Sequence, residues 1–344
     1  MKAAVLHKFN SPLSLDTVPL PEIGNTDVLV KIKASGICHS DLHHWRGSSA
    51  FSVPPKLPLI LGHECAGVVE RVGPFVKNVK PGDRVVADYL LTCGDCYYCS
   101  SGRSNLCDSA RAFGYSIDGA YAEYMALPSR QLFSLPAEIS YEQGAIIGCA
   151  VVTAYHAVRF AELTSSNSVA IFGIGGIGYN ILKLSQALGA KRIIAVDVDD
   201  RKLARASRLG AETINPNHKP AQEMIEELTG GNGVDLAFEA IGLRQTAESA
   251  IRAVGRGGKA VLVGLCFEKI EISPVADIML KEIQIESPSD HLRAEIPEVI
   301  ELVRQHRIDL SDSITHRLSL DEANRGLEIL EKKIDDPMRV VMLQ

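Results

Sequence analysis

The sequence lacks any run of apolar residues long enough to cross a lipid bilayer. Its most apolar stretch, Ala145 to Ala154, falls far short of the roughly 20 residues that a transmembrane helix needs. Residues 1–20 place Lys2, Lys8 and Asp16 among short apolar stretches, so they lack the uninterrupted apolar region of a secretory signal. We therefore expect a soluble, cytoplasmic protein without a membrane partner.

The sequence also lacks a basic patch, an internal repeat and a low-complexity tract. Its formal net charge is −6, with no long run of one sign. A protein that binds nucleic acid usually carries clustered Lys and Arg to offset the phosphate charge, so we expect no nucleic-acid partner. The 344 residues are too many for one core of ordinary size and predict two domains.

The first part of the chain has the pattern of β-strands. Residues 28–34 alternate apolar and charged side chains, which is the period of a half-buried strand. Extended runs follow at 65–69 and 83–86, and Pro81–Gly82 marks a turn between them. Glycine and proline recur at short intervals up to Pro136, as in an irregular, barrel-like all-β domain.

The pattern changes near residue 140, where strand-like and helix-like segments begin to alternate. Residues 168–172 and 193–196 are short apolar runs, each followed by a segment with helical spacing that stops at a glycine. Repeated β-α units predict an α/β domain with a parallel sheet covered by helices on both faces. Two amphipathic helices, about 295–305 and 321–332, and a strand at 338–342 are expected to complete the chain.

A glycine-rich motif follows the first strand of this α/β region. The motif comprises Gly173, Ile174, Gly175, Gly176, Ile177 and Gly178, and it precedes a helix. An acidic residue, Asp197, ends the next strand, which is the context of a dinucleotide-binding fold. Asp197 is suited to accept hydrogen bonds from ribose hydroxyls and to repel a 2′-phosphate, so NAD is favoured over NADP. The alternative is a glycine-rich turn that binds no nucleotide.

Four of the eight cysteines are closely spaced, at Cys93, Cys96, Cys99 and Cys107. Short loops between thiolates allow four sulfurs to surround one tetrahedral ion. Four cysteines leave no open coordination position, so the pattern predicts structural rather than catalytic zinc. An iron–sulfur cluster with similar ligand spacing, or a chance group of cysteines, is the alternative.

Other residues that can bind metals are scattered. Cys38 follows a predicted strand, His63 precedes one, and Cys149 lies far along the chain. Considered singly, the cysteines are better explained as small core residues and His63 as a buried, hydrogen-bonded histidine.

Together, these segments resemble one known family, the zinc-containing medium-chain alcohol dehydrogenases. The match runs in order through residues 36–43 (GICHSDLH), 62–69 (GHECAGVV), the four-cysteine segment, 147–149 (IGC), Thr153 and the glycine motif. It covers nearly the whole chain. The resemblance implies a GroES-like catalytic domain formed by residues 1–150 and 287–344, with the structural-zinc lobe at about 92–108. It implies a Rossmann NAD-binding domain at 151–286.

The resemblance also implies roles for individual residues in a two-zinc enzyme. Cys38, His63 and Cys149 would hold a catalytic zinc and leave its fourth position for substrate oxygen or water. Glu64 is similar to a glutamate that approaches the metal during ligand exchange, as an alternative ligand; an exposed or salt-bridged acid is the alternative explanation. Asp41 matches the residue that orients the histidine ligand.

The implied reaction is reversible hydride transfer between an alcohol and NAD, with zinc polarising the substrate oxygen. Ser40 would accept the alcohol proton, and a relay through the nicotinamide ribose would pass it to His43. The alternative for His43 is an ordinary surface histidine. Residues expected to contact the cofactor are His39, beside the pyrophosphate, and Thr153, Lys202, Val263 and Leu265.

Several alternatives remain open at this point. Sugar and polyol relatives often have glutamate where Cys149 stands, so the cysteine favours simple alcohols; a polyol, sugar or other secondary-alcohol dehydrogenase is the nearest alternative. A zinc-free reductase of the same superfamily and a catalytically inactive NAD-binding protein are more distant ones. By analogy we expect a homo-oligomer, and a tetramer rather than a dimer.

Overall fold

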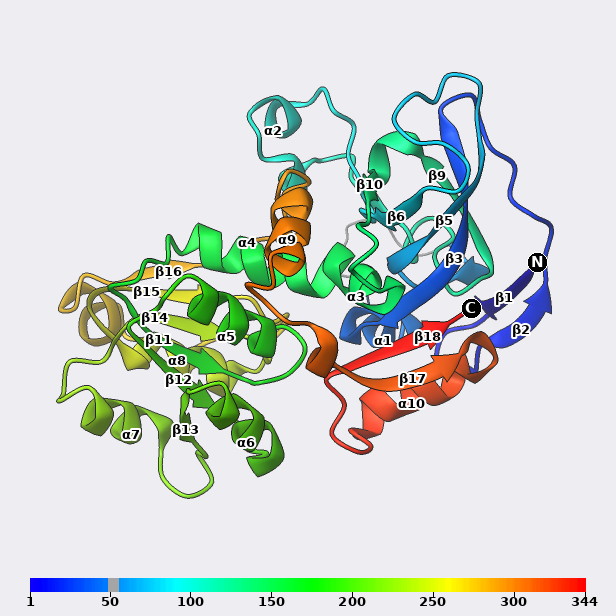
Figure 1. Ribbon diagram of the computed structural model, residues 1–344. Helices are drawn as coiled ribbons and strands as arrows, with labels where there is room; N and C mark the ends of the chain where they lie inside the picture. Colours follow the sequence, from blue (N-terminus) through cyan, green and yellow to red (C-terminus); the bar gives the residue numbers. More distant parts are fainter. Residues whose placement is uncertain (49–55) are drawn as a thin grey trace. The chain divides into compact units, whose positions relative to one another are not determined.

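A computed structural model describes residues 1–48 and 56–344 of the chain. The chain divides into two compact units (Figure 1). Unit 1 comprises Met1–Val152 and Leu292–Gln344, and unit 2 comprises Thr153–His291. Among the helices of the described residues, none combines the length and apolarity that crossing a membrane requires.

Unit 1 is built on a strongly bent, mostly antiparallel sheet with the order β10-β6-β5-β3-β18-β17, in which β9 also pairs with β3. The strands are β3 (Asp27–Ile37), β5 (Glu64–Val72), β6 (Arg84–Ala87), β9 (Tyr124–Pro128), β10 (Leu132–Ser134), β17 (Ile314–Ser319) and β18 (Arg339–Leu343). The register of β3 on β5 shifts twice, which bends the sheet and curves it around an apolar core. This irregular, curved sheet agrees with the predicted β-rich domain.

Two smaller sheets complete the strands of unit 1. One has the order β2-β1-β4, and the other pairs β7 with β8. Their bounds are β1 (Lys2–Leu6), β2 (Ser14–Thr17), β4 (Leu59–Ile60), β7 (Leu90–Leu91) and β8 (Arg111–Ala112). Strand β4 matters for the site because it leads directly into the segment that carries His63.

The helices of unit 1 are short, and a capping box begins one of them, α3. They are α1 (His39–Trp45), α2 (Tyr97–Ser100), α3 (Tyr141–Ile146), α9 (Glu295–Arg304) and α10 (Ala323–Lys332). The Ser140 hydroxyl accepts from the Gln143 amide, and the Gln143 side chain accepts from the Ser140 amide, so a capping box starts α3. The helix predicted at 321–332 starts instead with a 3₁₀ turn, Leu320–Glu322, and is α-helical from Ala323.

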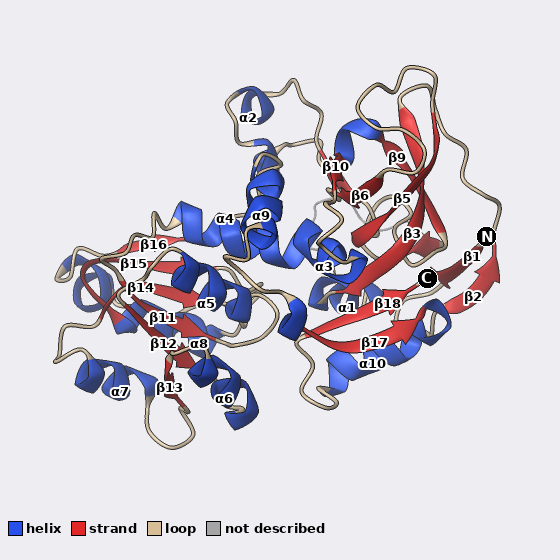
Figure 2. Ribbon diagram, in the orientation of Figure 1, coloured by secondary structure: helices blue, strands red, loops and turns tan. Residues whose placement is uncertain are grey.

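Unit 2 contains a six-stranded, fully parallel sheet with the order β13-β12-β11-β14-β15-β16. The strands are β11 (Ser168–Phe172), β12 (Arg192–Val196), β13 (Glu212–Ile214), β14 (Val234–Glu239), β15 (Val254–Leu262) and β16 (Gln284–Glu286). The helices are α4 (Val152–Phe160), α5 (Gly178–Ala187), α6 (Asp200–Arg208), α7 (Ala221–Leu228) and α8 (Arg244–Ala253). This is the predicted doubly wound fold, with helices against both faces of the sheet (Figure 2).

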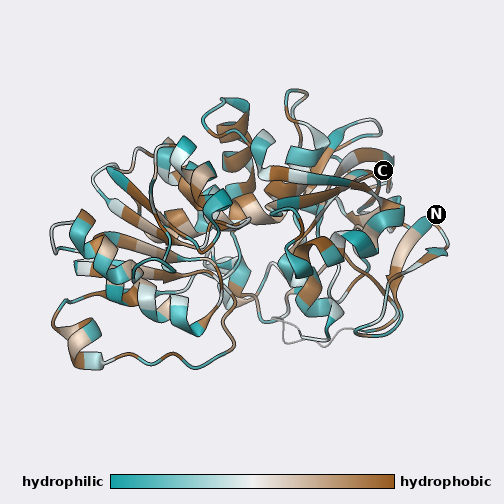
Figure 3. Ribbon diagram, turned by 90° about the horizontal axis from the view of Figure 1, so that it is seen from below, coloured by the Kyte–Doolittle hydropathy of each residue, from teal (hydrophilic) through white to brown (hydrophobic). Residues whose placement is uncertain are grey.

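The central strands of unit 2 are buried, which explains their continuous apolar character. Four of the five residues of β11 and of β12 are buried. Figure 3 shows brown, hydrophobic stretches along strands in the unit that does not carry the chain ends. The outer face of α6 is polar, so its side chains face solvent while Leu203 and Ala206 pack inward. A Rossmann-like sheet of this kind presents the carboxyl ends of its strands along one edge.

Candidate active site

The first candidate ligand, Cys38, lies where β3 ends and α1 begins. Cys38 is the N-terminal cap residue of α1, with an extended backbone. Its amide donates to Asp41 Oδ2 at 2.8 Å, so an acidic side chain in the first helical turn satisfies an otherwise free amide. The motif at residues 36–43 therefore forms a strand end and a helix start that together fix the direction of the Cys38 side chain.

The structure brings four scattered side chains together in unit 1. One ligand atom from each of Cys38, His63, Glu64 and Cys149 lies within 4.8 Å of the others. His63 immediately precedes β5 and Glu64 is its first residue, whereas Cys149 lies on η3, a π-helical turn over Ile147–Val151. A π-helical turn inside an α-helical segment is often found at functional sites.

These donors suit a zinc ion. Two thiols, one imidazole nitrogen and a nearby carboxylate form the mixed sulfur and nitrogen set that zinc binds, and three of the four residues are buried. The pKa of Cys38 is held well below its usual range by the hydrogen bond with Cys149, with further contributions from His63 and Arg339. A thiol that ionises easily is what metal binding requires.

Asp41 fixes the orientation of the His63 ring. Asp41 Oδ1 lies 3.1 Å from His63 Nδ1, and both side chains are buried. When Nδ1 donates this hydrogen bond, Nε2 is the nitrogen left to bind a metal. Tyr121, on the segment before β9, donates its hydroxyl proton to Asp41 Oδ2 at 2.8 Å.

Glu64 forms a fully buried ion pair with Arg339, which lies at the start of β18. Burial raises the pKa of Glu64 to about 7, and the Arg339 charge acts against that rise. One carboxylate oxygen binds Arg339, while Oε2 has no hydrogen-bond partner among the described residues. Arg339 therefore holds the Glu64 carboxylate beside the candidate ligands through Oε1 alone and leaves Oε2 without a hydrogen bond from the described residues.

The residues predicted to move protons lie on α1. Ser40 Oγ is 3.4 Å from His63 Nε2, and the Ser40 side chain is also hydrogen-bonded to Tyr115. His43 is half-buried, and its pKa is lowered by burial and then by the positive charge of Arg46. His39 is exposed at the start of the helix. Trp45 packs against the apolar core of unit 1, and its indole N–H donates to the Ser11 carbonyl, so the side chain has a structural role.

Four residues around this site were not found from the sequence. The rings of Tyr89 and Tyr115 lie 4.8 and 5.1 Å from the His63 ring, measured between centroids. Arg339 pairs with Glu64, and Tyr121 binds Asp41. Their only sequence signal is residue type, because aromatic and basic residues at these positions follow no local spacing that points to a metal.

The four-cysteine segment forms a second candidate metal centre. One sulfur from each of Cys93, Cys96, Cys99 and Cys107 lies within 4.8 Å of the others. None of these residues forms a disulfide. The amides of Cys93, Gly94 and Cys96 donate to sulfurs of the cluster, each at 3.4 Å, which stabilises negative charge on them. Four converging thiols, one from each cysteine, fit a closed, structural zinc site.

The glycine motif forms the turn between β11 and α5. Gly173 has φ +93°, a conformation that side chains disfavour, and a Cβ on Gly178 would lie 1.7 Å from the Gly173 carbonyl oxygen. A Cβ on Gly175 would meet nothing within 4 Å. The turn is therefore tight at Gly178 and open at Gly175, where a phosphate could approach the backbone.

The other predicted cofactor residues of unit 2 lie near this turn or after neighbouring strands. Asp197 follows β12 and accepts from the Ile174 amide at 2.8 Å; Lys202 Nζ is 4.0 Å from its carboxylate. Val263 and Leu265 follow β15, and Leu265 is exposed. The carboxyl ends of β11, β12 and β15 thus gather the motif, the acid and both apolar residues along one edge. Thr153 lies on α4.

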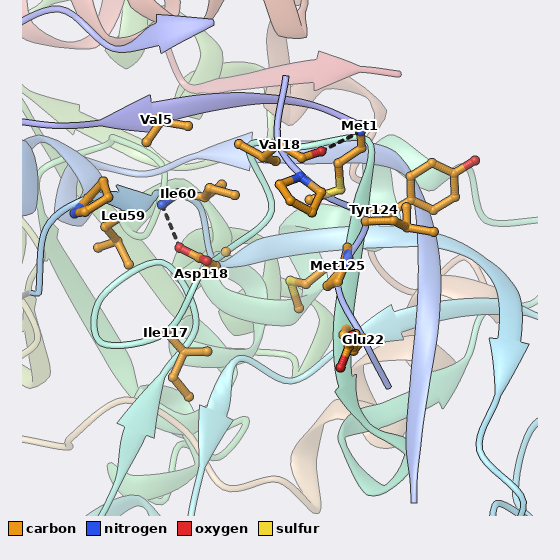
Figure 4. Close-up of a pocket in the computed structure, with 16 residues that line it drawn as sticks. Met1, Val5, Val18, Glu22, Leu59, Ile60, Ile117, Asp118, Tyr124 and Met125 are labelled. Atoms are coloured by element: carbon orange, nitrogen blue, oxygen red, sulfur yellow. Dashed lines mark hydrogen bonds between the residues drawn. The ribbon is translucent and has the colours of Figure 1, made fainter. Parts of the chain in front are cut away.

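A separate cavity of about 570 Å³ opens in unit 1 (Figure 4). Val5, Leu59, Ile117 and Met125 are among its lining residues, and Asp118 accepts from the Ile60 amide at its rim. None of the predicted site residues lines it among the described parts of the chain. The cavity is therefore distinct from both candidate metal centres.

Comparisons with known proteins agree with this geometry. Residues 24–137 match the family model of the alcohol dehydrogenase GroES-like domain, and residues 176–305 match that of zinc-binding dehydrogenases. The chain is 40% identical over 310 residues to an alcohol dehydrogenase of Geobacillus stearothermophilus, covering 90% of each chain. It is 34% identical over 330 residues to the sorbitol dehydrogenase of Bacillus subtilis strain 168, covering 95% of this chain and 93% of that one.

Among solved structures, a zinc-binding dehydrogenase from Sinorhizobium meliloti 1021 bound to NADP has a TM-score of 0.92 at 31% identity, covering 100% of this chain and 99% of the other. A GroES-like domain, a Rossmann-like domain and two zinc-type donor sets define the class as zinc-dependent, nicotinamide-linked oxidoreductases. The chain belongs to the zinc-containing medium-chain alcohol dehydrogenase family. The predicted family and fold class are confirmed.

Proposed function

We propose that this protein is an NAD-linked alcohol dehydrogenase that reversibly transfers hydride between a primary or secondary alcohol and the cofactor. The observation that carries the proposal is the convergence of Cys38, His63 and Cys149, with Glu64 beside them. These three residues would hold the catalytic zinc, and Glu64 would be its alternative ligand. Zinc, when bound, supplies a Lewis acid that polarises the substrate oxygen and favours loss of its proton.

In the proposed mechanism, the side chains of the protein handle the proton. The Ser40 hydroxyl, close to His63 Nε2, would take the proton of the substrate hydroxyl as it gives up its own proton toward His43. His43, four residues from the start of α1, then takes up the proton and exchanges it with solvent. Its lowered pKa keeps the imidazole neutral, and so able to accept a proton, at neutral pH. Asp41 keeps His63 in one orientation throughout.

The cofactor would lie along the carboxyl edge of the parallel sheet. The open backbone at Gly175 and the N-terminus of α5 would bind the pyrophosphate. Asp197, which is buried, would accept hydrogen bonds from the adenosine ribose and repel a 2′-phosphate, so NAD is preferred over NADP. His39, Thr153, Lys202, Val263 and Leu265 would make the remaining contacts. We expect Asp197→Ser to reduce the ratio of kcat/KM with NAD to kcat/KM with NADP.

Two experiments test this proposal. Zinc analysis should find two ions per chain, one in each donor set. Fewer than two ions would contradict this, and no zinc at the Cys38, His63 and Cys149 set would favour the reductase alternative. A screen of NAD reduction with primary, secondary and cyclic alcohols and with polyols should show simple alcohols as the better substrates. Faster turnover with NADP, or no turnover with any alcohol, would contradict the cofactor or the enzyme assignment.

A polyol substrate is the second candidate, favoured by the similarity to a sorbitol dehydrogenase. In the same screen, turnover that rises with the number of substrate hydroxyls would favour it. We also propose that the protein is a homo-oligomer, with a tetramer preferred over a dimer by analogy with the family. Light scattering on the purified enzyme measures this directly.

A further inference from the structure

We propose that Tyr121 is a positioning residue for the catalytic zinc, acting through Asp41 on both His63 and Cys38. The inference rests on the zinc ligands proposed above. It adds a residue that lies outside the motifs that carry the ligands. The geometry points to the Tyr121 hydroxyl, rather than its ring, as the group that matters.

The Asp41 carboxylate is hydrogen-bonded to two of the proposed zinc ligands, His63 and Cys38. Asp41 Oδ1 is hydrogen-bonded to His63 Nδ1 at 3.1 Å, and Asp41 Oδ2 accepts a hydrogen bond from the Cys38 amide at 2.8 Å. The third hydrogen bond, also 2.8 Å, comes from the Tyr121 hydroxyl to Oδ2. A small rotation of this carboxylate would move the imidazole of one ligand and loosen the backbone of the other.

The backbone around Tyr121 is held on two sides. The Tyr121 amide donates to the Leu61 carbonyl at 2.9 Å, and the Ala120 amide donates to the Gly62 carbonyl at 2.8 Å. On its other side, the Ala4 amide donates to the Tyr121 carbonyl at 2.8 Å. The segment before β9 is therefore bonded to the residues that immediately precede His63, which leaves the hydroxyl little freedom in where it points.

The ring itself fills the space next to Gly62. Gly62 has φ +91°, and a Cβ there would lie 2.2 Å from the Tyr121 ring. Tyr121 is completely buried. A phenylalanine ring would fill this space equally well, so packing alone gives no reason for a hydroxyl at this position.

The Tyr121 hydroxyl is held in its protonated form, which can donate a hydrogen bond. Burial, and then the charge of Asp41, raise the pKa of Tyr121 well above its usual range. Because Asp41 is also buried, no solvent is available to replace this donor if it is removed. Without it, Oδ2 would keep only the Cys38 amide, and the carboxylate would be held less firmly.

The test is Tyr121→Phe, read out by zinc release from the holoenzyme to a colorimetric chelator. Loss of residues that orient a metal ligand typically weakens metal binding 10–100-fold, and we expect the low end, about tenfold faster release from the Cys38 site. The four-cysteine site in the same molecule is an internal control and should release zinc at the wild-type rate. Cys38→Ser identifies which kinetic phase belongs to which site.

A matched control removes a different buried tyrosine hydroxyl. Tyr179 is buried on α5 in unit 2, and Tyr179→Phe should leave both release rates unchanged. The cobalt-substituted enzyme gives an independent readout, because a reoriented imidazole changes the visible bands of the catalytic site. An unchanged spectrum together with wild-type release rates in Tyr121→Phe would overturn the proposal, as would equal acceleration at both sites.

A double-mutant cycle separates action through Asp41 from a general loosening of the fold. In the Asp41→Asn background, Tyr121→Phe should change zinc release by less than about twofold, since the carboxylate it orients is gone. A full tenfold effect in that background would overturn the proposal. If the wild-type enzyme holds no zinc at Cys38, the proposed function itself fails. This result differs from one in which the wild type holds zinc and Tyr121→Phe releases it at the wild-type rate, which would overturn only the role of Tyr121.

Discussion

At the scale of single residues, His43 shows how position sets chemistry. Its ring lies half-buried on α1, three residues before Arg46. Burial and the Arg46 charge both disfavour the protonated imidazole and lower its pKa. The neutral form, which is the one that accepts a proton, therefore persists to a lower pH than in a free histidine. This predicts where the acid limb of the pH profile falls.

We predict that Arg46→Met moves the acid limb of alcohol oxidation to higher pH. Activity needs neutral His43, so the rate falls as the pH drops through its pKa, and removing the nearby positive charge raises that pKa. The measurement is kcat against pH between 5 and 8. Arg46→Lys keeps the charge and is the matched control. If the acid limb of the profile lies at the same pH in Arg46→Met as in the wild type, a group other than His43 causes it.

A second prediction at this scale concerns the Ser40 hydroxyl. Ser40→Ala removes the group placed to accept the substrate proton, so hydride transfer should slow by about 100-fold, the low end for lost acid–base catalysis. Stopped-flow measurement of NADH formation gives the rate, and zinc content should not change. Ser40→Thr keeps a hydroxyl and should retain most of the activity. A wild-type rate in Ser40→Ala would remove the serine from the relay.

At the scale of elements, the turn from β11 to α5 separates folding from cofactor binding. Gly178 has no room for a side chain, whereas Gly175 faces open space. The two glycines of one motif therefore serve different purposes. Gly178 allows the helix to pack on the strand, and Gly175 leaves room for a ligand to reach the backbone.

We predict opposite effects of alanine at these two positions. Gly178→Ala forces a carbonyl oxygen out of the way and should destabilise the protein by about 1–3 kcal/mol, as overpacking does. Gly175→Ala should keep wild-type thermal stability without cofactor and weaken NAD binding about tenfold or more, roughly 1.4 kcal/mol. Thermal unfolding and NAD titration measure the two effects. Weakened folding in Gly175→Ala with unchanged NAD binding would contradict this division.

The sequence predicted these elements well where the signal is local. The glycine motif, its strand, its helix and Asp197 fall within a short stretch of chain, so spacing alone identifies them. The partners of the metal site carry no such signal, because Arg339 lies 275 residues from Glu64 and Tyr121 lies 80 residues from Asp41. Cys149 sits on a π-helical turn, which the 3.6-residue pattern of an α-helix does not predict.

At the scale of the whole molecule, the two candidate metal centres have different structural support. Cys38 directly follows β3, His63 directly precedes β5 and Cys149 lies on η3. Asp41 and the Glu64–Arg339 pair brace these ligands. The four-cysteine lobe contains only α2, of four residues, and η1, a 3₁₀ turn over Ser104–Leu106. Neither helix has a buried residue. We therefore expect the framework to preform the first centre and the second centre to depend on a bound metal for its structure.

We predict that loss of each zinc has a different consequence. Cys38→Ser should abolish activity and leave the amide hydrogen exchange of β3 and β5 unchanged, because strands and ion pairs hold that centre. Cys107→Ser should speed exchange throughout residues 92–108, where metal ligation replaces the missing core, while β3 and β5 stay protected. Hydrogen-exchange mass spectrometry of both variants measures this, with the wild-type holoenzyme as reference. Persistent protection of the lobe in Cys107→Ser would show that its packing, rather than zinc, maintains its structure.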